Sequence, residues 1–236
     1  MYIIKNVIGI SIPDSKTRII RVFDRAKYDK LFSDNAIWFC NIDMLKEQCD
    51  NQERKIPQGF YKRMPISDAA HYETVNECKD GLYKSYISCW SQTECEQLWN
   101  TYDPNHEGFA LATTCGQIMS EIGNNCFLCC KVKYINFAAS NDVKMLGWAS
   151  LSDEKMSASV SVRIKEQYKD GEYINDNEIR FIGFDRQNVN GQNIHVNLSK
   201  IINGAIINPY ASSCVRQTLE VFLKKRGISL MQSECN

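Results

Sequence analysis

The sequence lacks a surplus of either charge and lacks the loops that bind phosphate. Its 236 residues hold 28 Lys+Arg and 28 Asp+Glu, so the formal net charge is zero. Because proteins that bind the phosphate backbone of nucleic acids usually carry a basic surplus, we expect no bulk nucleic-acid binding. No glycine-rich loop of the kind that cradles phosphates occurs in the chain. This absence excludes kinases, P-loop enzymes and Rossmann dinucleotide enzymes.

Long hydrophobic runs and linkers are also missing. No segment approaches the roughly 18 uncharged apolar residues that a membrane span needs. The opening stretch MYIIKNVIGISIPDSK is interrupted by Lys5 and Asn6 and has no export-type cleavage site. The five prolines are scattered, and no repeat or low-complexity tract occurs. We therefore predict a cytoplasmic protein without a membrane partner, folded as a single domain over residues 1–236. Residues 41–77 are expected to form a polar insertion or a long loop within it.

Cysteine, by contrast, is plentiful. The chain has eleven cysteines and no export signal, which predicts reduced and mostly buried thiols. Cys126 and Cys129 in CFLCCKVKY have the spacing of zinc ligands. The surrounding alternation reads as a strand, which would place these two side chains on opposite faces. No second cysteine pair accompanies them, so we predict no metal site.

The order of periodic segments predicts an α+β fold. Period-two alternation and β-branched or aromatic residues predict strands at 1–13, 17–24, 36–40, 85–90, 108–115, 126–137, 178–184, 194–198 and 204–209. Helical spacing predicts helices at 25–34, about 92–102, 116–123, 161–170 and 212–226, with a single turn near 199–202. We expect a mixed, mainly antiparallel sheet flanked by these helices.

The stretch YISCWSQTECEQLWNTYDPNHEGFALATTC, residues 86–115, concentrates two tryptophans, two tyrosines and three cysteines. Ser91 with Glu94 has the spacing of a capping box, which predicts the start of the helix. The helical spacing assigns Trp99 to a buried apolar face. Trp90, next to the capping serine, is expected to stay partly exposed and to stack on a nucleobase or nicotinamide ring. Tyr102 is the second candidate aromatic contact.

Charged residues on two strands leave two interpretations open. Glu178 and Arg180 fall on one face of the EIRFIGF strand, where they form either a solvated ion pair or a functional site. Arg21 on an early strand presents the same choice, because a guanidinium suits pyrophosphate or carboxylate recognition. The three histidines are scattered and none has a serine or cysteine partner in a nucleophile setting.

Five segments resemble a widespread, mostly bacterial family known as domain of unknown function 2971. They are TRIIRVFDRAKYDKLFSDNAIWF, EQCDNQER, SCWSQTECEQLWNTYDPNHEGFALATT, NDNEIRFI and IINPYA. The segment that begins Ser-Cys-Trp is the most distinctive. The chain departs from the family pattern around Asp50, where a proline is missing, and at Leu98, where the family usually has methionine. The resemblance implies a bacterial protein, and many members resemble components of anti-phage defence.

Two functions of different classes fit these features. The first is a nucleotide-using transferase resembling ADP-ribosyltransferases, with NAD as its substrate and Glu178 as the catalytic carboxylate. Its ligand-binding residues would be Arg21, Trp90, Tyr102 and Arg180. The alternative is a non-catalytic sensing or adaptor domain whose aromatic groove binds a protein partner or a small nucleotide. The transferase requires the Arg21 and Glu178 side chains to converge on one cleft.

Overall fold

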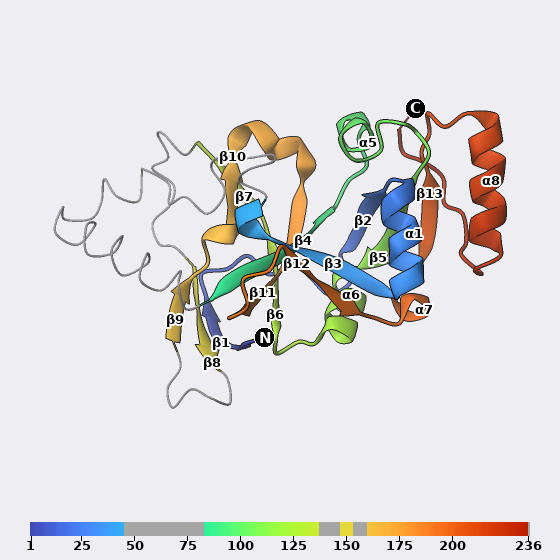
Figure 1. The fold of residues 1–236 in the computed structure, drawn as a ribbon. Helices are drawn as coiled ribbons and strands as arrows, with labels where there is room; N and C mark the ends of the chain where they lie inside the picture. Colours follow the sequence, from blue (N-terminus) through green and yellow to red (C-terminus); the bar gives the residue numbers. More distant parts are fainter. Residues whose placement is uncertain (45–82, 137–146, 153–159, 236) are drawn as a thin grey trace.

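The computed structural model describes residues 1–44, 83–136, 147–152 and 160–235 (Figure 1). It has the predicted α+β fold, with a mainly antiparallel sheet flanked by helices. Most of the predicted polar insertion at 41–77 lies outside the described residues.

The main sheet has eight strands, and all its pairings are antiparallel. Its strands are β2 (Arg18–Phe23), β3 (Ala36–Asn41), β4 (Lys84–Ser91), β5 (Phe109–Thr114), β6 (Phe127–Lys131), β11 (Glu178–Asp185), β12 (Gly191–His195) and β13 (Gly204–Ile207). One edge of β4 pairs along its whole length with β11, which also pairs with β6. The other edge is shared, because β3 pairs with Tyr86 and Ile87 whereas β2 pairs with Ser91. The sheet therefore forks beside residues 88–90, into a β3–β12 branch and a β2–β5–β13 branch.

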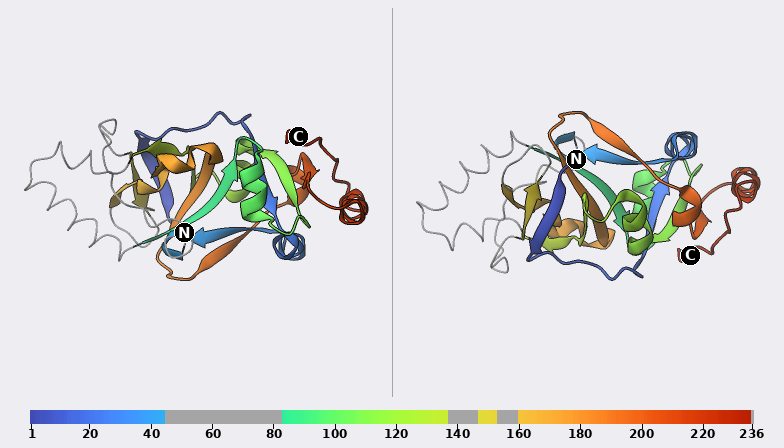
Figure 2. Two further views of the ribbon diagram at one scale, coloured as in Figure 1. Left: turned by 90° about the horizontal axis from the view of Figure 1, so that it is seen from above. Right: turned by 90° about the horizontal axis from the view of Figure 1, so that it is seen from below.

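Among the residues that the structure describes, two smaller sheets accompany the main one. An antiparallel sheet contains β1 (Ile3–Ile8), β8 (Trp148–Ser152) and β9 (Val160–Arg163), and it lies at the end of the molecule away from the last helix (Figures 1 and 2). A parallel pair joins β7 (Lys133–Ile135) to β10 (Tyr168–Asp170). The predicted helix at 161–170 is therefore wrong. This segment forms β9, a 3-10 turn η1 (Lys165–Gln167) and β10, because strand pairing with β8 and β7 outweighs its weak helical spacing.

The helices in the described part of the chain are α1 (Arg25–Asp34), α5 (Glu96–Tyr102), α6 (Cys115–Ile122), α7 (Leu198–Ile201) and α8 (Ser213–Lys224), with a further 3-10 segment η2 (Gly171–Asp176). Ser212 caps α8 by accepting from the Val215 amide at 3.3 Å. The predicted capping box at Ser91 is wrong, since Ser91 ends β4 and α5 begins only at Glu96. The hydroxyl of Ser91 instead donates to the carbonyls of Thr93 and Asp176.

Both faces of the main sheet are buried. One face packs against α1, α6, α7 and α8 in a large apolar cluster that includes Tyr28, Ile118 and Leu219. The other face is covered in two parts. The β1–β8 region packs over β4, β11 and β6, and α5 packs through its buried side chains over β2, β5 and β13. Among the described residues, no helix combines the length and apolar character needed to cross a membrane.

Candidate functional site

Glu178 and Arg180 form a buried ion pair on the face of β11 that the sequence predicts. Arg180 is 1% exposed and Glu178 is 6% exposed. The Arg180 Nε donates to Glu178 Oε1 at 2.7 Å, and the NH1 nitrogen donates to the Glu166 carbonyl at 2.9 Å. Lys169 Nζ contacts Glu178 Oε2 at 3.2 Å and Asp176 Oδ2 at 2.6 Å. The pair is thus part of an internal network and is not solvated.

The charges of this network keep Glu178 ionised. Burial by itself would raise the pKa of Glu178, but the positive charges of Arg180 and then Lys169 outweigh it and lower the pKa to about 2. The nearby Cys89 thiol lowers the pKa of this carboxylate further. Both carboxylate oxygens therefore already bind cationic donors, and little of their capacity faces a substrate.

Arg21 lies on the opposite face of the sheet from Glu178. Its NH1 nitrogen donates to Ser88 Oγ at 2.6 Å and to the Trp38 carbonyl at 3.3 Å. Ser88 pairs with Phe181 across β4 and β11, and Phe181 is three residues from Glu178 on a strand whose side chains alternate. The guanidinium thus fills the fork between β2 and β3. The convergence that a transferase requires does not occur.

The two candidate aromatic residues have different surroundings. Trp90 is 4% exposed, donates from Nε1 to Ser88 Oγ at 3.1 Å and packs edge-on against Phe181. Its expected partial exposure is wrong, because the ring points into the large apolar cluster and not outward at the strand end. Tyr102, the last residue of α5, is 41% exposed. Burial of its hydroxyl, followed by the nearby Cys89 and Glu178, raises the pKa of Tyr102.

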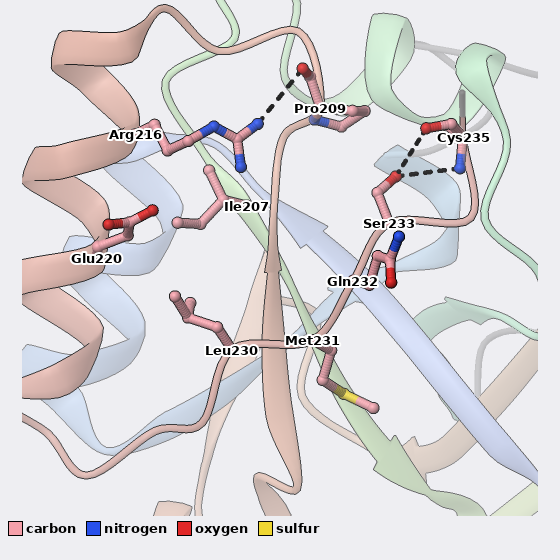
Figure 3. Close-up of a pocket in the computed structure, with 9 residues that line it drawn as sticks. All are labelled: Ile207, Pro209, Arg216, Glu220, Leu230, Met231, Gln232, Ser233 and Cys235. Atoms are coloured by element: carbon pink, nitrogen blue, oxygen red, sulfur yellow. Dashed lines mark hydrogen bonds between the residues drawn. The ribbon is translucent and has the colours of Figure 1, made fainter.

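A cavity of about 280 Å³ lies between α8, the end of β13 and the segment after Leu230, and sequence reasoning missed it (Figure 3). Its wall on α8 carries Arg216 and, one turn later, Glu220. The NH2 nitrogen of Arg216 makes only long hydrogen bonds, 3.4 Å to the Asn208 carbonyl and 3.5 Å to the Pro209 carbonyl. Its other nitrogens donate to no further residue in the described part of the chain. This guanidinium therefore retains donors for a ligand.

The rest of the cavity lining comes from β13 and the terminal segment, which Glu94 holds in place. Ile207, Leu230 and Met231 supply the apolar lining. Backbone hydrogen bonds join Ala205 of β13 to residues 229 and 231, so the terminal segment runs beside the sheet. Glu94, just before α5, accepts from Ser233 Oγ at 2.5 Å and from the Glu234 amide at 2.8 Å.

The described cysteines form no disulfide and no metal centre. No disulfide joins the nine cysteines that the structure describes, and Cys49 and Cys78 lie outside its ranges. No group of three or more His, Cys, Asp or Glu within the described ranges is placed to hold a metal ion. Cys126 precedes β6 and packs against the same apolar cluster as Cys129, so the expectation that they face opposite ways is wrong.

Fold and site together define an α+β protein with a forked antiparallel sheet, a buried ion-pair network and a small cavity that contains an arginine. The chain matches no protein-family model, and neither a curated protein nor a solved structure shows significant similarity to it. The resemblance to domain of unknown function 2971 stays a prediction, as do the bacterial origin and the cytoplasmic location.

Proposed function

We propose that the chain is a non-catalytic sensing or adaptor domain that binds a small carboxylate-bearing ligand at Arg216. This proposal rests on a comparison of three arginines, which differ in how many of their hydrogen-bond donors are already used within the protein. All three side-chain nitrogens of Arg180 donate hydrogen bonds within the protein. Arg21 donates to Ser88 at the fork of the sheet. Of these three arginines, Arg216 is the one that lines a cavity and has donors that bind no described residue. Its fork-shaped guanidinium suits bidentate binding of a carboxylate.

The size and lining of the cavity limit the ligand. Ligand pockets usually measure about 300–1,000 Å³, so the cavity of about 280 Å³ suits a ligand of amino-acid size and not a dinucleotide. Its apolar residues Ile207, Leu230 and Met231 favour an aliphatic group beside the carboxylate. Two sources offer this chemistry: a free amino acid, or the carboxy-terminal residue of a partner protein.

We expect wild-type protein to bind L-leucine or N-acetyl-L-leucine, and not leucinamide, which lacks the carboxylate. Arg216→Gln should weaken binding by roughly 10- to 100-fold, because a charge-assisted hydrogen bond contributes about 1.5–3 kcal/mol. Calorimetric titration and amide chemical shifts would measure both effects. Lys224→Gln, an exposed change on the same helix, is the matched control. Equal binding of leucinamide, no binding of either carboxylate, or unchanged affinity in Arg216→Gln would overturn the assignment.

Glu220 distinguishes the two sources of the ligand. The ammonium group of a free amino acid can bind this carboxylate while its own carboxylate binds Arg216. Tighter binding of leucine than of N-acetyl-leucine, with the difference lost in Glu220→Gln, would identify a sensor of free amino acids. If N-acetyl-leucine binds as tightly as leucine, and Glu220→Gln leaves its affinity unchanged, the protein is an adaptor that captures carboxy termini.

The transferase alternative predicts that the protein releases nicotinamide from NAD, whereas the binding domain predicts no release. Because Arg21 and Glu178 lie on opposite faces and Trp90 is buried, we expect no release of nicotinamide when the protein is incubated with NAD and cell lysate. Chromatography of labelled nicotinamide would measure this. Release that disappears in a folded Glu178→Gln variant, but persists in Arg216→Gln, would support the transferase and contradict the binding domain.

A further inference from the structure

The outer edge of β13 runs beside the cavity at Arg216, and the terminal segment (residues 229–235) pairs with the start of that edge. The Ala205 amide donates to the Ser229 carbonyl at 2.9 Å, and the Ala205 carbonyl accepts from the Met231 amide at 2.8 Å. This is the bonding pattern of a parallel pair. Both backbone groups of Ala205 therefore point to the edge of β13 that faces away from β5.

Ile207 presents its backbone groups to the same edge, because amide and carbonyl directions repeat every second residue along a strand. Asn208, the next residue, points the other way and donates from its amide to the Gly108 carbonyl at 3.2 Å. Among the residues that the structure describes, none donates a hydrogen bond to the Ile207 carbonyl. Ile207 is 4% exposed and lines the cavity, so this carbonyl is an unused acceptor beside the space for a ligand (Figure 3).

The Ile207 carbonyl lies close to the carboxylate site. Within one residue the amide lies toward the start of the strand and the carbonyl toward its end, so the Ile207 amide lies on the side of Met231 and the carbonyl on the side of Asn208. The NH2 nitrogen of Arg216 reaches the carbonyls of the two residues after Ile207, at 3.4 and 3.5 Å. Because one residue of a strand advances about 3.3 Å, a ligand that binds Arg216 through its carboxylate can also reach the Ile207 carbonyl with a group on its α-carbon.

We propose that the Ile207 carbonyl is a second anchor of the ligand and accepts a hydrogen bond from a nitrogen on the ligand's α-carbon. This inference rests on the proposed carboxylate site at Arg216 and narrows its ligands to α-amino acids and their N-acyl forms. The carboxylate binds Arg216, the nitrogen binds the edge of β13, and the side chain meets the apolar lining that includes Leu230 and Met231. Three contacts of different chemistry around one carbon atom distinguish mirror-image ligands, so the site discriminates between enantiomers.

Replacing the ligand nitrogen by oxygen tests the second anchor. O-acetyl-L-leucic acid has the shape and the carboxylate of N-acetyl-L-leucine, but an ester oxygen stands where the amide donates. We expect it to bind at least about tenfold more weakly in calorimetric titration, because it leaves the buried Ile207 carbonyl unpaired. Likewise 4-methylpentanoate, which lacks the nitrogen, should bind at least about tenfold more weakly than L-leucine. The affinities of N-acetyl-L-leucine and N-acetyl-D-leucine should also differ by about tenfold.

A second measurement observes the carbonyl itself. In protein labelled with carbon-13, the Ile207 carbonyl resonance should shift when the nitrogen-bearing ligand binds and should not shift with the ester. The Ala205 carbonyl, which already accepts from Met231, is the matched control and should not move. A shift with N-acetyl-leucine identifies protein carboxy termini as ligands, and a shift with leucine alone identifies free amino acids.

The outcomes separate the second anchor from the carboxylate site. Equal binding of amide and ester, equal binding of the two enantiomers, or an Ile207 resonance that stays unchanged with every bound ligand would overturn the second anchor and leave the site at Arg216 intact. Leucinamide that binds as tightly as leucine would overturn both.

Discussion

Replacing Glu178 by glutamine is expected to destabilise the folded protein by about 3–5 kcal/mol, because it removes the negative charge of a buried ion pair that binds both Arg180 and Lys169. Arg180 is almost completely buried, and Lys169 would keep only Asp176 as its acidic partner. A loss of this size is a large part of the roughly 5–15 kcal/mol that stabilises a typical domain. Denaturant unfolding would measure it.

The pH dependence of stability provides an independent measure of the same pair. The pKa of Glu178 is about 2 in the folded protein, against about 4.3 for an unperturbed glutamate. Because the folded pKa is the lower one, this stabilisation is fully present above about pH 4.3 and is lost as the pH falls toward 2. The difference in unfolding free energy between wild type and Glu178→Gln should therefore shrink by about 3 kcal/mol over that range.

Two further variants separate the ion pair from other effects. Glu172→Gln changes an exposed glutamate of η2 and should alter stability by less than about 0.5 kcal/mol. Combining Glu178→Leu with Arg180→Met removes both members of this ion pair, and this double variant should be more stable than Glu178→Gln. If Glu178→Gln unfolds like wild type at pH 7, the carboxylate is not structural and is available for catalysis, as the transferase requires.

Much of the fold follows from local patterns in the sequence. The strand at 178–184 and the common face of Glu178 and Arg180 are confirmed by β11, and the last helix, predicted at 212–226, is confirmed by α8. These features depend on neighbours within one element. What the pattern leaves open is whether an ion pair on a strand is solvated or buried, since that depends on the β1–β8 region and η1 covering the face.

The candidate sites depend on contacts between distant segments, which a single sequence does not reveal. Trp90 is buried because α1, α6 and α8 cover the face of the sheet into which its ring points. The cavity at Arg216 exists because residues after Leu230 run beside β13 and because Glu94 holds Glu234, 140 positions later in the chain. The spacing of Arg216 and Glu220 on α8 is visible in the sequence, but the wall that faces them is not.

Leu98→Asp is expected to prevent folding to a stable protein. Leu98 is 8% exposed, and α5 packs through it and Trp99 onto the apolar residues of β2, β5 and β13. An aspartate there would bury an unpaired charge, and a helix of seven residues has little stability of its own without this packing. Soluble yield and thermal unfolding would measure the effect. Gln97→Asp, at the exposed neighbouring position, should leave both unchanged.

A milder change at the same position connects this packing to the cavity. Leu98→Ala should cost about 2–4 kcal/mol and leave a folded protein that can be titrated. Trp99 Nε1 donates to Glu94 at 2.8 Å, and Glu94 holds the segment that contains Ser233. Loosening α5 should therefore weaken leucine or N-acetyl-leucine binding at Arg216, although Leu98 does not line that cavity. Full ligand affinity in a destabilised Leu98→Ala variant would show that α5 does not hold the wall, and an unchanged melting temperature would show that this face of α5 is not core.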